Sequence, residues 1–585
     1  MSIPANFPAK SFQEVNQILT SPGMPWEMST VEIKGVPTRI YKHAPPTMRS
    51  LWTICKAHGK KDYIIYENER YTYEDAHKLV EHYASYLYHQ LGCRKGDRIA
   101  ICARNLPDWV WVWWATQWIG AVTVAVNAWL PADSLHHCLT FTTPRVVFVD
   151  SERSPLIAPM TKSLEEVGGT RFVLSFRDPK ASSFGFLNFS DEIKAHKTLA
   201  VPEVKTEADE LATIYFTSGT TGLPKGVMTT SRQYIHNAIN SMYGGARMLL
   251  RRGESLPTPS PDDVQKSTLL AVPLFHAMGN HSVIGLGTAI GAKIVLIRKW
   301  DAEEAASLIL KEQLSSVSGI PFMATEVVAV LRKRGASHLL ESVSVGGAPS
   351  SGGLPKDVGK IGAAPGQGYG ATEVSSMATS VVGEDYLLRP KTAGLPCPVV
   401  DIKIMNPDTL KEVPVGEAGE VWISGPGRTN GYWRNEKATK KAFTEHGFYR
   451  TGDVGYLDQE GFLYISDRIK DMVVRGGENI ATVTIEDELF KEEKVMDCAA
   501  FGVPDDRLGE TVAAAVVVKA EYRSQVTEQQ LIDFVAKKLP KHSVPAMIAF
   551  YDQLPRNGVG KTDKKILRTE VAKLHAERKK GKSKL

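Results

Sequence analysis

The sequence is poor in cysteine and lacks any strong surplus of charge. Its 585 residues include six cysteines, and none of them forms a Cys-x-x-Cys pair or a cysteine–histidine cluster with the spacing of a zinc site. We therefore expect buried free thiols in a reducing compartment. Lysine and arginine total 70 and aspartate and glutamate 65, which gives a net charge of +5.

The small positive surplus lies at the carboxyl end of the chain. The last fifteen residues, VAKLHAERKKGKSKL, contain six basic residues and one acidic residue, which equals the surplus of the whole protein. A broad basic surface for nucleic acid is therefore not expected. The final residues Ser583, Lys584 and Leu585 have the form of a peroxisomal address, and they predict a peroxisomal import receptor as a partner. Without that address, a cytoplasmic location is expected.

Long uninterrupted apolar runs are also missing. The N-terminus does not have the charged-then-apolar pattern of a secretory signal. The most apolar run, WVWVWWATQWIGAVTVAV, is broken by polar residues and a glycine, and it is shorter than the roughly 20 residues that a spanning helix needs. We expect a buried helix at 109–118, a buried strand at 121–126 and no transmembrane segment.

The chain does contain a regular alternation of apolar, β-branched runs with amphipathic helical patterns. Helices are expected at 73–91 and 301–314, and buried strands at 97–103, 122–128, 145–150, 267–275 and 292–298. This alternation is typical of layered α/β structure with mostly parallel sheets. The length predicts several folding units.

The character of the sequence changes after Thr392. Short strands joined by glycine- and aspartate-rich turns predict a small, β-barrel-like antiparallel unit at about 392–469. A compact α+β pattern follows. We expect a large N-terminal α/β domain over 1–469 and a small, mobile α+β C-terminal domain over 470–585. The stretch 251–263, rich in proline and serine, is expected to be an exposed loop.

A turn rich in hydroxyl groups and glycine follows the apolar segment LATIYF. The stretch YFTSGTTGLPKGVMTT, residues 215–230, places glycines where backbone amides can approach an anion, hydroxyls that can donate, and a lysine that adds charge. It differs from the common phosphate loop, in which glycine and lysine stand directly before serine or threonine. Since a polar surface loop is the plain alternative, this stretch alone does not decide a function.

Four more stretches follow in order: SVGGAPSS at 344–351, GQGYGATE at 366–373, a long segment at 449–480, and LPRNGVGKTDKK at 554–565. With the turn, this set resembles the adenylate-forming (AMP-binding) superfamily, most of all its medium- and long-chain fatty acyl-CoA ligases. The resemblance covers about the whole chain beyond residue 50. It implies that a carboxylate is joined to the α-phosphate of ATP, releasing pyrophosphate, and that coenzyme A then displaces AMP.

The resemblance also implies roles for individual residues. Lys561 would stand between the carboxylate and the α-phosphate, where positive charge must meet two approaching anions. Glu373 and Thr220 would hold Mg²⁺, while Thr220 and Thr221 would contact the β- and γ-phosphates. His276 would flank the acyl pocket, although an ordinary buried histidine is the alternative.

Nucleotide selection and the second half-reaction need further residues. By the same resemblance, Tyr369 would stack on adenine, Asp453 would accept the ribose hydroxyls, and Lys470 would be the hinge of the C-terminal domain. Gly477 would let the CoA thiol pass close to the backbone. The expected nucleotide- and CoA-binding residues are Thr217, Ser218, Gly219, Gly222, Lys225, Gly347, Ala348, Pro349, Gly368, Tyr369, Gly370, Ala371, Thr372, Asp453, Arg468, Lys470, Gly476, Gly477 and Glu478.

The first hypothesis for function is a fatty acyl-CoA synthetase, a monomer or homodimer. The alternative is a ligase of the same mechanism that acts on an aryl or specialised carboxylic acid. A non-catalytic nucleotide-binding relative and a luciferase-type enzyme are further alternatives. A peptide-synthetase module is disfavoured, because little chain follows Lys561 to hold a carrier domain.

Overall fold

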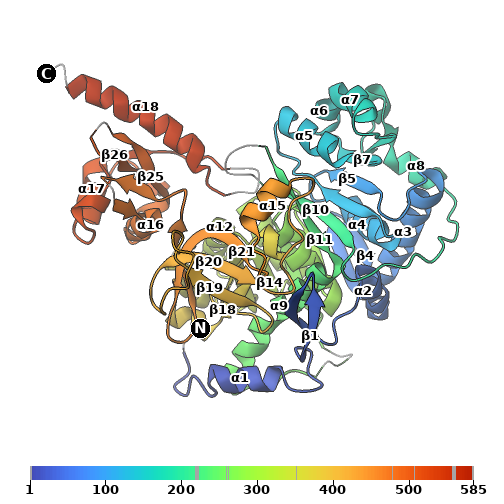
Figure 1. Ribbon diagram of the computed structural model, residues 1–585, viewed down its shortest axis with the longest axis horizontal. Coiled ribbons are helices and arrows are strands. Elements are labelled where there is room, and N and C mark those ends of the chain that lie inside the picture. Colours follow the sequence, from blue (N-terminus) through green and yellow to red (C-terminus); the bar gives the residue numbers. More distant parts are fainter. Residues whose placement is uncertain are drawn as a thin grey trace.

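The computed structural model describes residues 3–217, 223–258, 260, 263–336, 338–348, 350, 352–476, 478–505, 507–556 and 561–582. Its main body is built on two large sheets (Figure 1). Every neighbouring pair in the first sheet is parallel except β10 with β11. In order across this sheet, the strands are β11 (Lys225–Thr230), β10 (Leu211–Thr217), β6 (Val122–Ala125), β5 (Arg98–Cys102), β7 (Val146–Asp150), β8 (Phe172–Phe176) and β9 (Leu187–Asn188).

The second sheet is parallel through its centre and antiparallel at both ends. Its strands, in order, are β18 (Leu395–Pro396), β17 (Thr379–Val382), β16 (Ala364–Tyr369), β15 (Ser342–Gly346), β14 (Ser316–Gly319), β12 (Ser267–Leu270), β13 (Lys293–Leu296), β3 (Asp62–Tyr66) and β4 (Glu69–Thr72). The predicted layered α/β class is confirmed. The expected strand 267–275 ends early, at Leu270, because Pro273 has no amide hydrogen for a ladder and begins a turn in which His276 N–H bonds to its carbonyl.

Helices cover the two sheets, and their starts are set by local side-chain caps. Asp301 accepts from the amide of Glu304 at 2.8 Å and starts α11, whereas Thr230 and Gln233 form a capping box that starts α9. The helices of the main body are α1 (Phe12–Leu19), α2 (Met48–Cys55), α3 (Tyr73–Ser85), α4 (Pro107–Trp118), α5 (Ala132–Thr142), α6 (Ser154–Ile157), α7 (Thr161–Glu166), α8 (Phe189–Ala195), α9 (Ser231–Arg251), α10 (Gly285–Ile290), α11 (Ala302–Glu312), α12 (Pro321–Lys333), α13 (Leu354–Lys360), α14 (Glu384–Leu388) and α15 (Glu436–Ala442). The expected helix 73–91 continues beyond α3 as a π-helical segment, Tyr86–Gln90.

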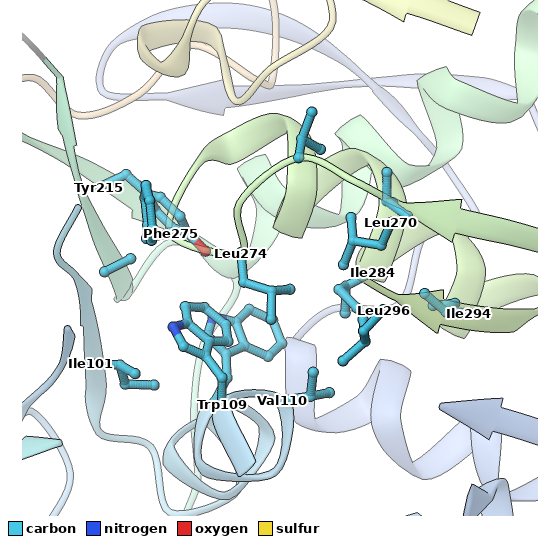
Figure 2. Packing of buried hydrophobic residues seen from close by; sticks show 14 of the residues in the cluster. Ile101, Trp109, Val110, Tyr215, Leu270, Leu274, Phe275, Ile284, Ile294 and Leu296 are labelled. Carbon is cyan, nitrogen blue, oxygen red and sulfur yellow. The ribbon is translucent and has the colours of Figure 1, made fainter. Parts of the chain in front are cut away.

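The tryptophan-rich run forms the buried helix α4, as predicted. Its four tryptophans from Trp109 to Trp114 are at most 1% exposed. Figure 2 shows Trp109 and Val110 of α4 packed with Leu274, Ile284 and Leu296, on one side of the second sheet. Aromatic side chains of this size contribute strongly to the hydrophobic core. None of the helices that the structure describes is both long and apolar enough to cross a membrane.

The expected small β unit is an antiparallel sheet next to the second large sheet. Its strands are β19 (Asp401–Met405), β20 (Gly419–Ser424), β21 (Tyr449–Leu457) and β22 (Leu463–Arg468). A separate hairpin, β1 (Met28–Ile33) with β2 (Val36–Tyr41), lies near the N-terminus.

The C-terminal α+β elements stand to one side of the main body, at the upper left of Figure 1. They have two core clusters of their own, one on each face of the β25–β26 sheet. The elements are β23 (Val473–Arg475), β24 (Glu478–Ile480), α16 (Thr482–Leu489), β25 (Val495–Asp505), β26 (Gly509–Val518), α17 (Glu528–Ala536), β27 (Met547–Phe550) and α18 (Lys564–Lys582). We call them the C-terminal unit; its boundary near Lys470 stays a prediction.

Two other expectations concern cysteines and a loop. All six cysteines are free and buried, as predicted. The loop expected at 251–263 does not begin at its first residue: Arg251 is the last residue of α9, is 4% exposed and pairs with Asp385 at 2.8 Å. Residues 259, 261 and 262 of that stretch lie outside the described part of the chain.

Candidate active site

One cavity of about 2230 Å³ lies between the ends of β14, β15 and β16, the small β unit and the C-terminal unit. This volume exceeds what one small ligand fills, so there is room for more than one substrate. The candidate residues that line it are Thr217, Lys225, His276, Gly347, Ala348, Gly368, Tyr369, Gly370, Ala371, Thr372, Glu373, Asp453, Arg468, Lys470 and Lys561. Ser218, Gly219, Thr220, Thr221, Gly222, Pro349 and Gly477 lie outside the described residues.

The phosphate-loop candidates at the two ends of the turn face each other. Thr217 ends β10, Lys225 begins β11, and the two are paired in register. The Lys225 ammonium lies 5.0 Å from the ring centroid of Tyr432. This places one positive charge beside the opening of the turn, close to the carboxylate described next.

Glu373 lies in a single turn, Thr372–Val374, directly after β16. Its Oε1 accepts a hydrogen bond from the Tyr432 hydroxyl at 2.8 Å, and the residue is 8% exposed. Burial raises the pKa of Glu373, while the Tyr432 hydrogen bond and the charges of Arg468 and Lys225 oppose that rise. A buried carboxylate with unfilled lone pairs that lines a cavity is a suitable ligand for a cation.

The fit of Mg²⁺ to this carboxylate can be tested on the surrounding donors. Among the described residues, no group of three or more His, Cys, Asp or Glu side chains could hold a metal ion. Mg²⁺ typically binds through one or two carboxylates and takes its remaining ligands from water and substrate phosphates. Glu373 alone therefore fits a Mg²⁺ that arrives with a phosphate substrate.

Asp453 is held by partners from two strands. Its carboxylate accepts from the Tyr369 hydroxyl at 2.7 Å and from Arg468 Nε at 2.8 Å, because Asp453 and Arg468 are register partners across β21 and β22. The charge of Asp453 is the main cause that raises the pKa of Arg468. A carboxylate offers about four lone-pair sites, so two remain for ligand hydroxyls.

Lys561 reaches the main body from the C-terminal unit. A Cβ placed on Gly347, at the end of β15, would lie 3.7 Å from Lys561 Cε, so the two residues are close neighbours. Gly347 has φ of +76°, a conformation that favours glycine. Burial and then the charge of Arg468 lower the pKa of Lys561 to about 8, against the opposing effect of Asp453 and Glu373.

His276 lines the same cavity as a neutral side chain. Its Nδ1 accepts from the amide of Met278 at 3.3 Å, so the ring hydrogen lies on Nε2. Burial, and then the positive charge of Lys561, lower the pKa of His276 to about 3. It can donate a hydrogen bond here, but it does not carry charge at neutral pH.

The expected CoA loop does not line this cavity. Gly476 has φ of +61° and donates to the Leu508 carbonyl at 2.8 Å, and Glu478 lies 3.3 Å from His542 Nδ1. Gly476 lies in the turn between β23 and β24, and Glu478 is the first residue of β24. Of the candidate residues that the structure describes, these two are the ones it does not bring to the site.

The sequence patterns do not predict the contacts between the C-terminal unit and the main body. Asp467, directly before Arg468, accepts from the amide of Thr482 at the start of α16. Lys391 forms an ion pair with Asp487. Nothing in the sequence pattern relates Lys391 to Asp487, since their elements are far apart along the chain. Thr482 is fully buried at this contact.

The sequence also missed the wall of the cavity between α9 and β17. This region, which we call the acyl region, is lined mainly by small side chains and hydroxyls. Its members are Ser241 and Gly244 of α9, Ser282 of the π-helical segment Met278–Ile284, Gly366 and Gly368 of β16, Ser376 and Met377 of the turn before β17, and Ser380 and Val382 of β17.

Comparisons with known proteins show the family of this chain. Residues 51–433 match the family described as AMP-binding enzyme, and residues 484–561 match the AMP-binding enzyme C-terminal domain. A 2-succinylbenzoate–CoA ligase of Bacillus mycoides (strain KBAB4) is 31% identical over 511 residues, which cover 87% of this chain and 95% of that protein.

Solved structures are similar to this chain over most of its length. ATP-bound MatB from Rhodopseudomonas palustris is 25% identical, with a TM-score of 0.77, and the match covers 90% of this chain and 99% of that one. O-succinylbenzoate coenzyme A synthetase (MenE) from Bacillus subtilis, with ATP and magnesium, is 25% identical with a TM-score of 0.71, covering 89% and 98%.

One expectation is corrected by these relatives. The tripeptide Ser583, Lys584 and Leu585 predicts a peroxisomal location and import receptor, but the similar ligases come from Bacillus, and bacteria have no peroxisomes. The peroxisomal prediction is therefore wrong. A three-residue motif matches by chance far more easily than the long motifs do, and these residues lie outside the described part of the chain.

Proposed function

The chain belongs to the AMP-binding enzyme family, and from that premise we propose that it activates an aryl or related ring-bearing carboxylic acid as its CoA thioester. It is an acid–thiol ligase, and ATP, Mg²⁺ and coenzyme A are its cofactors and co-substrate. The observation that carries the proposal is the approach of Lys561 to Gly347 within the cavity that Glu373 and Asp453 also line.

In the first half-reaction, a substrate carboxylate oxygen attacks the α-phosphorus of ATP and pyrophosphate leaves. The Lys561 ammonium would lie between the two anions and offset their repulsion. Glu373 would hold Mg²⁺, which neutralises phosphate charge, while Lys225 and the hydroxyls of Thr220 and Thr221 would grip the leaving pyrophosphate. Asp453 would accept the ribose hydroxyls.

In the second half-reaction, the CoA sulfur attacks the acyl carbonyl and AMP leaves. Since Gly476 and Glu478 do not line the cavity in this arrangement, we propose that the C-terminal unit turns about Lys470 to bring their loop, with Gly477, to the site. Lys561 would leave in the same movement. The present arrangement would then be the adenylating one.

The aryl alternative is better supported than the fatty acid expected first. Relatives that cover most of this chain are named 2-succinylbenzoate–CoA ligases, and that name concerns an aryl carboxylate. The acyl region also suits a ring-bearing acid, because its lining includes the hydroxyls of Ser241, Ser282 and Ser376 beside the small Gly244. A long alkyl chain gains most from an apolar tunnel.

CoA-dependent AMP release tests this proposal on the purified chain with Mg²⁺ and ATP. The acids should include benzoate, succinylbenzoate and phenylpropanoate, with octanoate and palmitate as the fatty acid arm. We expect kcat/KM for at least one aryl acid to exceed that for both fatty acids by tenfold or more. A preference for palmitate would overturn the aryl assignment, and no AMP release with any acid would overturn the proposed function.

A further inference from the structure

The turn after Glu373 has a strained backbone at a serine that lines the acyl region. Ser376 has φ of +97°, far from the conformations that a residue with a side chain prefers. Holding such a residue there costs on the order of 1–3 kcal/mol, and strain of this kind concentrates at functional sites. Glycine would relieve it, yet the residue is serine. The hydroxyl is therefore a candidate for a specific task.

A chain of hydrogen bonds behind the cavity wall reaches this hydroxyl. The Asn237 side chain, 1% exposed, accepts from the Met377 amide at 2.9 Å through Oδ1. That bond fixes the amide orientation, so Asn237 Nδ2 is the atom that faces Ser282 Oγ, at 3.4 Å. Since an amide nitrogen only donates, Ser282 accepts there.

The chain of hydrogen bonds continues to Ser376. Ser282 Oγ lies 2.9 Å from Ser376 Oγ, and either hydroxyl could donate. A hydroxyl has one hydrogen and two lone pairs, so Ser282 can accept from Asn237 and then either donate to Ser376 or accept from it. In the first case Ser376 accepts, and its own hydrogen remains for the contents of the cavity.

A neighbouring hydroxyl in the same wall is used differently. Ser241 Oγ donates to the Asn237 carbonyl of its own helix at 2.9 Å, so its hydrogen is consumed. Ser241 therefore offers the cavity only an acceptor, whereas Ser376 offers a donor when Ser282 donates to it.

We propose that Ser282 donates to Ser376, which leaves the Ser376 hydrogen to select acids that carry a hydrogen-bond acceptor, such as a ketone, ether or second carboxylate oxygen, beyond the reacting carboxylate. This inference rests on the proposed function and names its substrate class more closely. An acid with a methylene in place of the acceptor would leave the Ser376 hydroxyl desolvated and unpaired, which a site built to donate penalises.

The test uses matched pairs of acids that differ only at the acceptor. These are phenoxyacetate with phenylpropanoate, benzoylpropanoate with phenylbutanoate, and benzoylbutanoate with phenylpentanoate. We measure pyrophosphate release by the full chain with ATP and Mg²⁺. In at least one pair, kcat/KM should be higher for the acceptor acid by roughly tenfold.

Two variants separate the hydroxyl from the strain. Ser376→Ala removes the hydroxyl and keeps a side chain at positive φ, whereas Ser376→Gly removes both. Both should reduce the ratio within the preferred pair to about one, chiefly through the acceptor acid, and Ser376→Gly should not lower the Tm. Ser241→Ala, the matched control, should keep the ratio.

The outcomes are distinct. Equal activity within every pair that is turned over, or an unchanged ratio in both Ser376 variants, would overturn the inference and leave the ligase proposal standing. If Ser241→Ala abolished the ratio as strongly as Ser376→Ala, the assigned direction of the hydrogen bonds would be wrong. Absence of pyrophosphate release with every aryl and fatty acid would overturn the proposed function itself.

Discussion

The guanidinium of Arg556 lies 3.9 Å from the centroid of the Phe322 ring, and this contact joins the C-terminal unit to helix α12. Asp497, also in the C-terminal unit, holds the same guanidinium through a 2.6 Å ion pair. With the Lys391–Asp487 ion pair, the ring contact supports the orientation in which Lys561 reaches Gly347.

Replacing Phe322 by leucine should weaken that orientation. A cation–π contact contributes about 0.5–2 kcal/mol, and leucine keeps the apolar volume without the ring face. We expect Phe322→Leu to slow pyrophosphate release roughly threefold to tenfold, while CoA thioester formation from a supplied acyl-adenylate stays unchanged. Lys333→Ala, at the exposed end of the same helix, is the control. Equal loss in both half-reactions would contradict the assignment.

The fold was predictable from sequence where its cause is local. The buried helix α4 and the strands β5, β6 and β7 follow from apolar patterns within each segment. Their observed ends lie close to the predicted ones. The expected strand 267–275 is longer than β12 because the apolar run continues past Pro273, which lacks the amide hydrogen that a ladder needs.

Site residues that stand in long motifs were predictable from the sequence. Contacts between elements that are distant along the chain were not. Glu373, Asp453 and Lys561 stand in motifs, and the structure brings them to one cavity. The relation between Asn237 and Ser376 has no counterpart in the sequence, since it depends on how α9 packs against the turn before β17. The contact between the Ser282 and Ser376 hydroxyls likewise follows only from the coordinates.

The pH dependence of adenylation should follow the protonation state of Lys561. Burial and the charge of Arg468 lower its pKa to about 8, so its ammonium is charged below pH 8 and loses its proton as the pH rises through that value. We expect kcat/KM for pyrophosphate release to fall above about pH 8. Lys561→Arg should be slower at neutral pH but should lack this fall, because a guanidinium keeps its proton. An identical fall in both enzymes would assign the titration to another group.

The Mg²⁺ dependence of the reaction rate should be set by the negative charge of Glu373. Glu373→Gln keeps an oxygen that can accept from Tyr432 but removes the negative charge, so the Mg²⁺ concentration at half-maximal rate should rise about tenfold or more. Glu326→Gln changes another carboxylate of the same cavity, one that accepts from Trp300, and should leave this concentration unchanged. A similar rise in both variants would show a general charge effect of the cavity instead.

The absence of a side chain at Gly244 should determine how long an acid the acyl region accepts. A Cβ on this residue would lie 3.0 Å from Ser380 Oγ and 3.0 Å from Val382 Cγ2, both on β17, so alanine narrows the space between α9 and that strand. Alanine also favours a helix interior by roughly 0.5–1 kcal/mol over glycine, so stability should not fall greatly. Gly244→Ala should lower kcat/KM for benzoylbutanoate about tenfold and leave kcat/KM for phenoxyacetate within about twofold, because a longer acid reaches further along α9.

Gly245→Ala is a matched control on the same helix, since its Cβ would meet no atom within 4 Å among the described residues. Equal loss for both acids in Gly244→Ala, or the same pattern in Gly245→Ala, would place the end of the acyl region elsewhere in the cavity.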